Sequence, residues 1–165
     1  MSQDASRNRP QPTKEHLRLR ETAGTWNVQC TFFMDPSQPP MQADAKETVE
    51  MFGEFWAVSR FEAELFGAPF QGRATIGYEP HNHRWVSTWI DQVSPHLYYF
   101  VGGYDPSGKV LAMRGEGPDP QTGRPTEFHT VETTIDPNSR HFEMFLKLPD
   151  GTDFRMFRYV YRRAS

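Results

Sequence analysis

The chain has 165 residues and a formal net charge of −3, and aromatic residues make up 14% of its sequence. This length indicates one domain that is large enough to bury a hydrophobic core, and the aromatic content favours β structure. The acidic balance argues against nucleic-acid binding, because proteins that bind a duplex present a basic face to its phosphates.

The first residues predict a disordered tail and then a short helix. Residues 1–12 are polar, include Pro10 and Pro12, and lack periodicity. A helix is expected to follow, with Thr13 as its N-cap, Leu17 and Leu19 as apolar contacts and Gly24 after its end. We expect this helix to plug one open end of the fold.

From Gly24 onward, short segments of alternating aromatic and β-branched residues are separated by turns rich in Pro, Gly, Asp and Asn. In these turns Pro fixes φ, and Gly or Asn accepts a positive φ. The pattern predicts strands over residues 25–34, 42–51, 55–65, 70–79, 84–91, 96–103, 109–115, 126–135, 140–148 and 153–163, and a proline-rich loop over residues 117–125.

Nearly every connection between these strands is short, so consecutive strands should pair as antiparallel neighbours. An open sheet of about ten strands would leave two exposed edges, and closure into a barrel removes them. We therefore expect an all-β protein in which residues 13–165 form a single up-and-down antiparallel β-barrel with a short N-terminal helix. The interior of such a barrel either fills with side chains or holds one small ligand.

The tripeptide Gly24-Thr25-Trp26 opens the first strand and is similar to the Gly-x-Trp signature of lipocalin-type barrels. This resemblance implies that Trp26 packs at the floor of the barrel. It also implies that a basic residue of the last strand, Arg162 or Arg163, stacks on the Trp26 ring through a cation–π contact.

A second resemblance extends from about Leu17 to Arg163. Its segments, in this order, are Gln38-Pro39-Pro40-Met41, Gly77-Tyr78-Glu79-Pro80, Thr88-Trp89-Ile90-Asp91, His96-Leu97, Gly108-Lys109-Val110-Leu111, Gly115-Glu116-Gly117-Pro118-Asp119 and Tyr161-Arg162-Arg163. Together they resemble a bacterial family of proteins of unknown function, number fifteen-seventy-nine, which is grouped with calycin-like β-barrels. The resemblance implies a barrel similar to lipocalins and fatty-acid-binding proteins, and it implies no particular activity.

The single cysteine, Cys30, excludes an internal disulfide bond and is typical of a reducing compartment. It lies inside an apolar strand, where a buried inert thiol is more common than a nucleophile. The polar N-terminus lacks the apolar segment of a secretory signal, and no stretch has the length of a membrane span. These observations predict a cytoplasmic protein that binds neither nucleic acid nor membrane.

Seven residues in or beside the apolar strands are candidates for binding a ligand. They are Trp89, Asp91, His96, Tyr98, Glu116, His129 and Arg158. Because side chains alternate along a strand, Trp89 and Asp91 share one face. His96 and Tyr98 share a face of the next strand, and Glu116 ends its strand at the proline-rich loop, on what we expect to be the same rim.

Asp91 and His96 have two interpretations. Across a short turn the carboxylate can orient the imidazole and raise its pKa, which prepares a general base or a polar contact for a ligand. Alternatively, residues 91–96 form an ordinary turn, in which Asp91 accepts hydrogen bonds from backbone N–H groups. The sequence alone leaves both interpretations open.

The sequence does not give the direction of two further candidates. Both faces of the strand that carries His129 contain polar residues. Arg158 would need an anion if it lay inside an apolar barrel, either a glutamate or the acidic head of a ligand, whereas outside it would be an ordinary surface cation. His81 and His83 have a spacing that metal ligands can adopt, but they lie in a turn without a third ligand, so no metal site is expected.

These observations favour the binding of a small apolar or aromatic molecule, with a polar head, inside the barrel. One alternative is an enzyme, such as an isomerase, cyclase or hydrolase, that uses His96 with Asp91 or Glu116 as an acid–base pair. Another is haem binding through an axial histidine, although the sequence identifies no cofactor. Two copies of the chain could also pair through exposed strands as a homodimer.

Overall fold

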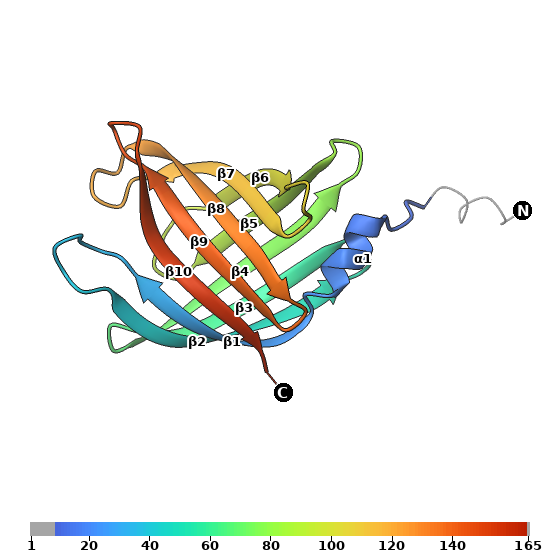
Figure 1. The fold of residues 1–165 in the computed structure, drawn as a ribbon, viewed down its shortest axis with the longest axis horizontal. Helices are drawn as coiled ribbons and strands as arrows, with labels where there is room; N and C mark the ends of the chain where they lie inside the picture. Colours follow the sequence, from blue (N-terminus) through green and yellow to red (C-terminus); the bar gives the residue numbers. More distant parts are fainter. Residues whose placement is uncertain (1–8, 165) are drawn as a thin grey trace, which may run out of the picture.

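The structure is a computed structural model that describes residues 9–164. The sequence predicts disorder over residues 1–12, and residues 1–8 of this segment lie outside the described range. The elements, in chain order, are α1 Lys14–Arg20, β1 Gly24–Phe32, β2 Met41–Phe52, β3 Trp56–Leu65, β4 Ala68–Glu79, β5 Arg84–Asp91, β6 Tyr98–Tyr104, β7 Val110–Pro118, β8 Pro125–Asp136, β9 Ser139–Lys147 and β10 Asp153–Arg163 (Figure 1).

The strands form one closed antiparallel barrel in which each strand pairs with its neighbours in the sequence (Figure 1). β1 also pairs with β10, from Trp26 opposite Arg163 to Phe32 opposite Phe157, and this ladder closes the sheet. Closure removes the free edges that would otherwise invite aggregation. The up-and-down barrel with a short N-terminal helix, predicted from the sequence, is confirmed.

The strand boundaries differ most from the prediction around the proline-rich loop. β7 runs to Pro118 and β8 begins at Pro125, and these two residues face each other at the end of the ladder. Proline is tolerated at the end of a strand, where the loss of its N–H removes no essential ladder hydrogen bond. β6 begins only at Tyr98, so that His96 lies in the turn before the strand.

Helix α1 lies across one end of the barrel, which we call the helix end (Figure 1). Thr13 is its N-cap, as predicted. The buried ring of His16 holds the helix to the barrel: Nδ1 accepts a hydrogen bond from the backbone N–H of Thr13 at 2.9 Å, and Nε2 lies 3.1 Å from the carbonyl oxygen of Tyr78 in β4. Because Nδ1 is the acceptor, the proton of the neutral ring is on Nε2, which donates to Tyr78. The turns from β1 to β2 and from β5 to β6 belong to the opposite end, the far end.

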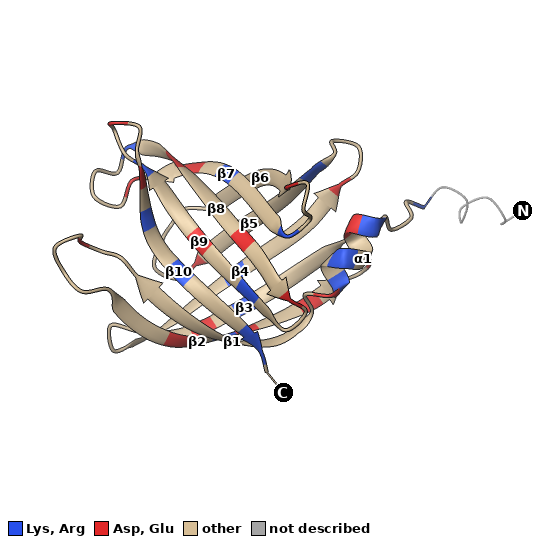
Figure 2. Ribbon diagram, viewed as in Figure 1, with Lys and Arg blue, Asp and Glu red and all other residues tan. Residues whose placement is uncertain are grey.

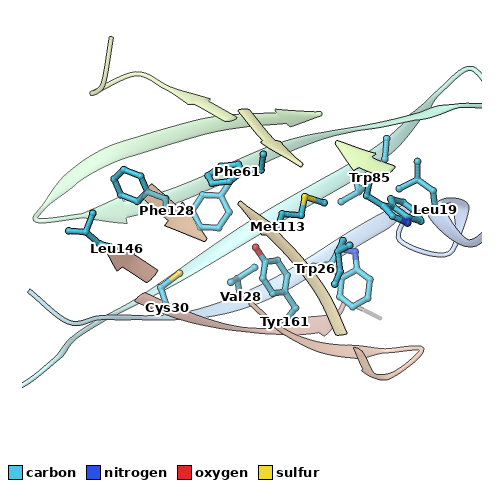
Figure 3. Close-up of a cluster of buried hydrophobic side chains, with 14 residues drawn as sticks. Leu19, Trp26, Val28, Cys30, Phe61, Trp85, Met113, Phe128, Leu146 and Tyr161 are labelled. Carbon is cyan, nitrogen blue, oxygen red and sulfur yellow. The ribbon is translucent and has the colours of Figure 1, made fainter. Parts of the chain in front are cut away.

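The inward faces of the strands contribute one hydrophobic cluster (Figure 3). Trp26 and Trp85 lie beside Leu19 of helix α1 (Figure 3). Cys30 belongs to the same cluster with an exposed fraction of 1%, and burial raises the pKa of its thiol to about 12. The thiol is therefore protonated at neutral pH, in agreement with the inert cysteine that the sequence predicts.

The outside of the barrel carries both signs of charge, interspersed along the strands on the side shown in Figure 2. That side shows no continuous basic stripe of the kind that nucleic-acid-binding proteins use. Among residues 9–164, no helix has the length and apolar character needed to cross a membrane.

Candidate functional site: a cavity along the barrel axis

The barrel contains a cavity of about 420 Å³, partly open to solvent, that extends from Leu19 at the helix end to Phe32 at the far end. Aromatic rings from most of the strands line it. Pockets for small molecules have volumes of roughly 300–1,000 Å³ and mainly apolar walls with a few polar groups. The size and lining of this cavity agree with both properties.

Stacked aromatic rings form the middle of the cavity. The rings of Phe61 and Tyr159 are nearly parallel, with centroids 5.5 Å apart, and the indole of Trp89 meets Phe61 edge-on at 6.0 Å. Phe157 stacks on Tyr159 at 4.6 Å. Offset and edge-to-face contacts of this kind hold rings in fixed orientations. The middle of the cavity therefore presents rigid, flat walls.

Charged residues occupy the helix end of the cavity. Nη2 of Arg140 lies 3.1 Å from Oε2 of Glu47, and its Nε lies 3.8 Å from Oε2 of Glu132. The exposed fractions of Arg140 and Glu47 are only 9% and 7%. We call these three residues, together with Ser59, the floor cluster. Ser59 pairs with Val49 in the ladder between β2 and β3, so it is a diagonal neighbour of Glu47 on the inward face.

The local register brings the floor cluster together with two aromatic rings. Glu47 pairs with Trp26 in β1, and Arg140 pairs with Tyr161 in β10. The Arg140 guanidinium carbon lies 4.6 Å from the centroid of Trp26 and 4.4 Å from that of Tyr161, so cation–π attraction adds to the ion pairs. Burial by itself lowers the pKa of Arg140, but Glu132 and Glu47 raise it by more, and the guanidinium stays charged.

Trp26 also carries the cation predicted from the Gly-x-Trp resemblance. The guanidinium carbon of Arg163 lies 4.2 Å from the Trp26 ring centroid. Its nitrogens donate to the carbonyl oxygens of Ala23 and Glu21 at 2.7 Å and of Pro137 at 3.2 Å. Arg163, not Arg162, therefore joins the last strand to the segment after α1.

Two polar atoms of the floor cluster lack a hydrogen-bond partner among the described residues. They are Oγ of Ser59 and Nε of Arg140, both buried in residues that line the cavity. Most buried polar atoms in folded proteins have at least one partner. The two atoms are therefore unsatisfied donors or acceptors in the wall of the cavity. The hydroxyls of Tyr159 and Tyr161 also stay neutral there, because burial raises the pKa of each well above its ordinary value.

Three of the seven residues predicted from the sequence line the cavity: Trp89, Asp91 and Tyr98. Asp91 acts as a turn cap. Its Oδ1 accepts hydrogen bonds from the backbone N–H groups of Val93 at 3.0 Å and Ser94 at 2.8 Å, and its Oδ2 accepts one from the indole N–H of Trp89 at 2.9 Å. The second interpretation of Asp91, an ordinary turn, is the arrangement that the structure shows.

His96 and Glu116 do not line the cavity. Nε2 of His96 lies 3.4 Å from the backbone carbonyl oxygen of Glu116, whose side chain is exposed. Within residues 9–164, no hydrogen bond or ion pair joins His96 to Asp91. His96 and Glu116 thus lie on the same rim as Asp91, but their side chains form no acid–base pair, because His96 precedes β6 and Glu116 alternates with the inward positions of β7.

His129 and Arg158 lie on the outer face of the barrel. The ring of His129 stacks on Phe145 with centroids 4.7 Å apart, and Nη2 of Arg158 lies 3.3 Å from Nδ1 of His141. Neither residue is part of the cavity wall. No histidine of residues 9–164 lines the cavity, so the residues present do not fit a haem held by an axial histidine.

The sequence analysis missed Arg140 and Glu47. Each lies two positions from a residue on the apolar face of its strand: Arg140 from Phe142, and Glu47 from Val49. The alternation of side chains therefore contained the signal. A charged residue in phase with an apolar face indicates an interior charge, which needs a partner from another strand.

Comparisons with known proteins agree with the fold. The sequence matches a family model described as "Protein of unknown function (DUF1579)" over residues 11–163. The structure is similar to the crystal structure of Rv2717c from M. tuberculosis, with a TM-score of 0.66 and 12% sequence identity, over 94% of this chain and 100% of that one. A de novo designed fluorescence-activating β-barrel has a TM-score of 0.48 and 13% identity, over 88% and 95% of the two chains. A search of curated proteins finds no match. The likeness to Rv2717c shows a shared fold alone.

Proposed function

Because the chain belongs to the family of proteins of unknown function DUF1579, we propose a function from its own cavity: the barrel binds a small apolar or aromatic molecule that has one polar head. The observation that carries the proposal is a mainly apolar cavity of about 420 Å³ inside the barrel with two unpartnered buried polar atoms in its wall, as far as residues 9–164 show. An unsatisfied buried polar atom costs about 1–3 kcal/mol. A bound polar head removes this cost.

The lining orients the proposed ligand. Its apolar body packs against the wall that Phe61, Trp89 and Tyr159 form, where burial of apolar area and contact with the rings stabilise it. Its head lies at the floor cluster near Arg140 and Ser59. Tyr98 and Trp89, which the sequence predicted as ligand contacts, lie toward the far end and contact the body rather than the head.

Ligand binding has more support than the enzyme alternative. The acid–base pair of His96 and Asp91 is not assembled, since Asp91 is engaged by Trp89 and by the turn backbone. We also propose a cytoplasmic location, supported by the buried, protonated thiol of Cys30. A homodimer stays a prediction from the sequence.

Native mass spectrometry of the freshly purified full chain tests the proposal. We expect a population whose mass exceeds that of the polypeptide by one small molecule, and loss of this excess mass on denaturation. Titration of the delipidated protein with a naphthalene-based probe, followed by tryptophan fluorescence, then measures binding directly.

A matched pair of variants places the probe in the cavity. Thr130→Phe fills the cavity from β8, because Thr130 lines it and is buried. Thr133→Phe puts the same ring on the opposite face of the same strand. We expect Thr130→Phe to abolish binding and Thr133→Phe to leave it unchanged. Equal binding by both variants, or no adduct and no probe binding by the wild type, would refute the proposal.

A further inference from the structure

The floor cluster contains more negative than positive charge. Arg140 supplies one guanidinium, and both Glu47 and Glu132 have a carboxylate oxygen within 4 Å of it. The cation that fatty-acid-like ligands would require is therefore already paired. Moving another carboxylate out of water to this place would cost several kcal/mol, with no free cation of the cluster to offset it.

Arg18 is the other cation of the cavity lining. Its guanidinium carbon lies 3.7 Å from the ring centroid of Tyr104, and its Nη2 donates to the carbonyl oxygen of Gly108. With Arg18 included, two cations balance the two carboxylates of the floor cluster. Glu21 and Asp136, exposed at the margin of the helix end, add further negative charge. This surplus of negative charge disfavours an anionic head at this end of the cavity.

The free hydrogen-bonding groups of the cluster include both a donor and an acceptor. Nε–H of Arg140 has no acceptor, and Glu132 accepts no hydrogen bond from any residue between 9 and 164. Nε of Arg140 and Oε2 of Glu132 are 3.8 Å apart. This distance is too long for a direct hydrogen bond, but it allows one oxygen atom to contact both atoms. A hydroxyl accepts from Nε–H and donates to the carboxylate at the same time, whereas a carboxylate only accepts and an ammonium only donates.

We infer that the floor cluster selects a neutral hydroxyl head, so that the ligand is an apolar or aromatic alcohol or phenol rather than a carboxylic acid. The hydroxyl oxygen lies between Nε of Arg140 and Oε2 of Glu132. The inference rests on the proposed function and names the ligand class of that same cavity.

Three probes with one ring system test the inference: naphthol, naphthoate and naphthylmethylamine. They share the apolar body and differ in the head, which at pH 7 is a neutral hydroxyl, an anion and a cation. Titration of the full chain, followed by calorimetry, measures the three dissociation constants. We expect naphthol to bind at least about tenfold more tightly than either charged probe, equivalent to about 1.4 kcal/mol per tenfold.

A pair of isosteric variants assigns the selectivity to the floor cluster. Glu132→Gln removes one of the two carboxylates beside Arg140. Glu127→Gln, on the same strand, removes an outward carboxylate that pairs with Arg114 at 3.0 Å. We expect Glu132→Gln to reduce the preference for naphthol over naphthoate by about tenfold and Glu127→Gln to leave it unchanged.

The outcomes separate the two proposals. If naphthoate or the amine binds as tightly as naphthol, the hydroxyl inference fails while the binding function stands. If none of the probes binds and native mass spectra show no adduct, both fail. If the two glutamine variants change the preference equally, the floor cluster does not set it. Should Glu132→Gln not fold, the wild-type ratio of naphthol to naphthoate still decides.

Discussion

Arg140 in β9 and Glu47 in β2 form an ion pair across the inside of the barrel, with Nη2 3.1 Å from Oε2 although the residues are 93 positions apart in the chain. The pair lies beside Trp26 and Tyr161 of the strands that close the sheet. Desolvation largely offsets the attraction within a buried ion pair, so such a pair contributes little net stability. The pair also gives the aromatic cavity a polar, charged floor.

Removal of the cation alone is expected to be severe. Arg140→Met leaves Glu47 and Glu132 buried without their common partner, and breaking a buried pair costs about 3–5 kcal/mol. Urea unfolding followed by tryptophan fluorescence measures the loss. Arg155→Met is the control, because its pair with Glu143 is partly exposed and should be worth less than about 1 kcal/mol. Equal losses in the two variants would contradict a special role of Arg140.

Arg163 is expected to be irreplaceable by lysine. Its planar guanidinium stacks on Trp26 and donates to three backbone carbonyl groups, which the single ammonium of lysine cannot reproduce. We expect Arg163→Lys to lower the free energy of unfolding by about 1–3 kcal/mol. Arg162→Lys, at the exposed neighbouring position, should change it by less than about 0.5 kcal/mol. Thermal unfolding of both variants compares them.

The absence of a side chain at Gly72 leaves room for the indole of Trp89, which lines the cavity. A Cβ at this position would come within 2.1 Å of the indole of Trp89, whereas a Cβ at Gly103 would meet nothing within 4 Å. Gly72→Ala should therefore displace the indole, break its hydrogen bond to Asp91 and cost about 1–3 kcal/mol.

The readouts are tryptophan emission and probe affinity. We expect Gly72→Ala to shift the emission maximum and weaken naphthol binding. Gly103→Ala should leave both measurements as in the wild type, and a Gly72→Ala variant that also does so would show that Trp89 does not form the wall.

Cys30 should be unreactive while the protein is folded. Its thiol pKa of about 12 keeps it protonated at pH 8, and the side chain is inaccessible. An aromatic disulfide reagent should modify it only after unfolding in guanidinium chloride. Above the ordinary thiol pKa the unfolded chain loses this proton and the folded chain keeps it, so the thiol lowers stability as pH rises through that range. Rapid modification of the native protein at pH 8 would contradict the burial of Cys30.

The sequence predicts the barrel well because its signals are local. Alternation of apolar residues and the turn residues between strands give ten strands close to their observed bounds. The floor contact between Trp26 and the last strand also follows from a resemblance, and the structure assigns it to Arg163.

The interior chemistry was harder to predict because it depends on pairs of residues from distant strands. Arg140 and Glu47 each interrupt an apolar face, which by itself is a weak signal, and only barrel closure brings them together. Arg158 was ambiguous for a related reason: both faces of β10 mix cations with aromatic rings, and a bulge between Arg155 and Phe157 shifts the alternation.

A crystal structure of the wild-type protein grown with naphthol tests the central claim most directly. We expect electron density for the ring inside the barrel, against the wall formed by Phe61, Trp89 and Tyr159, with the hydroxyl oxygen within hydrogen-bond distance of Arg140 and Glu132. Density for naphthol only on the outside of the barrel, or an interior filled by side chains with no room for the ring, would contradict it.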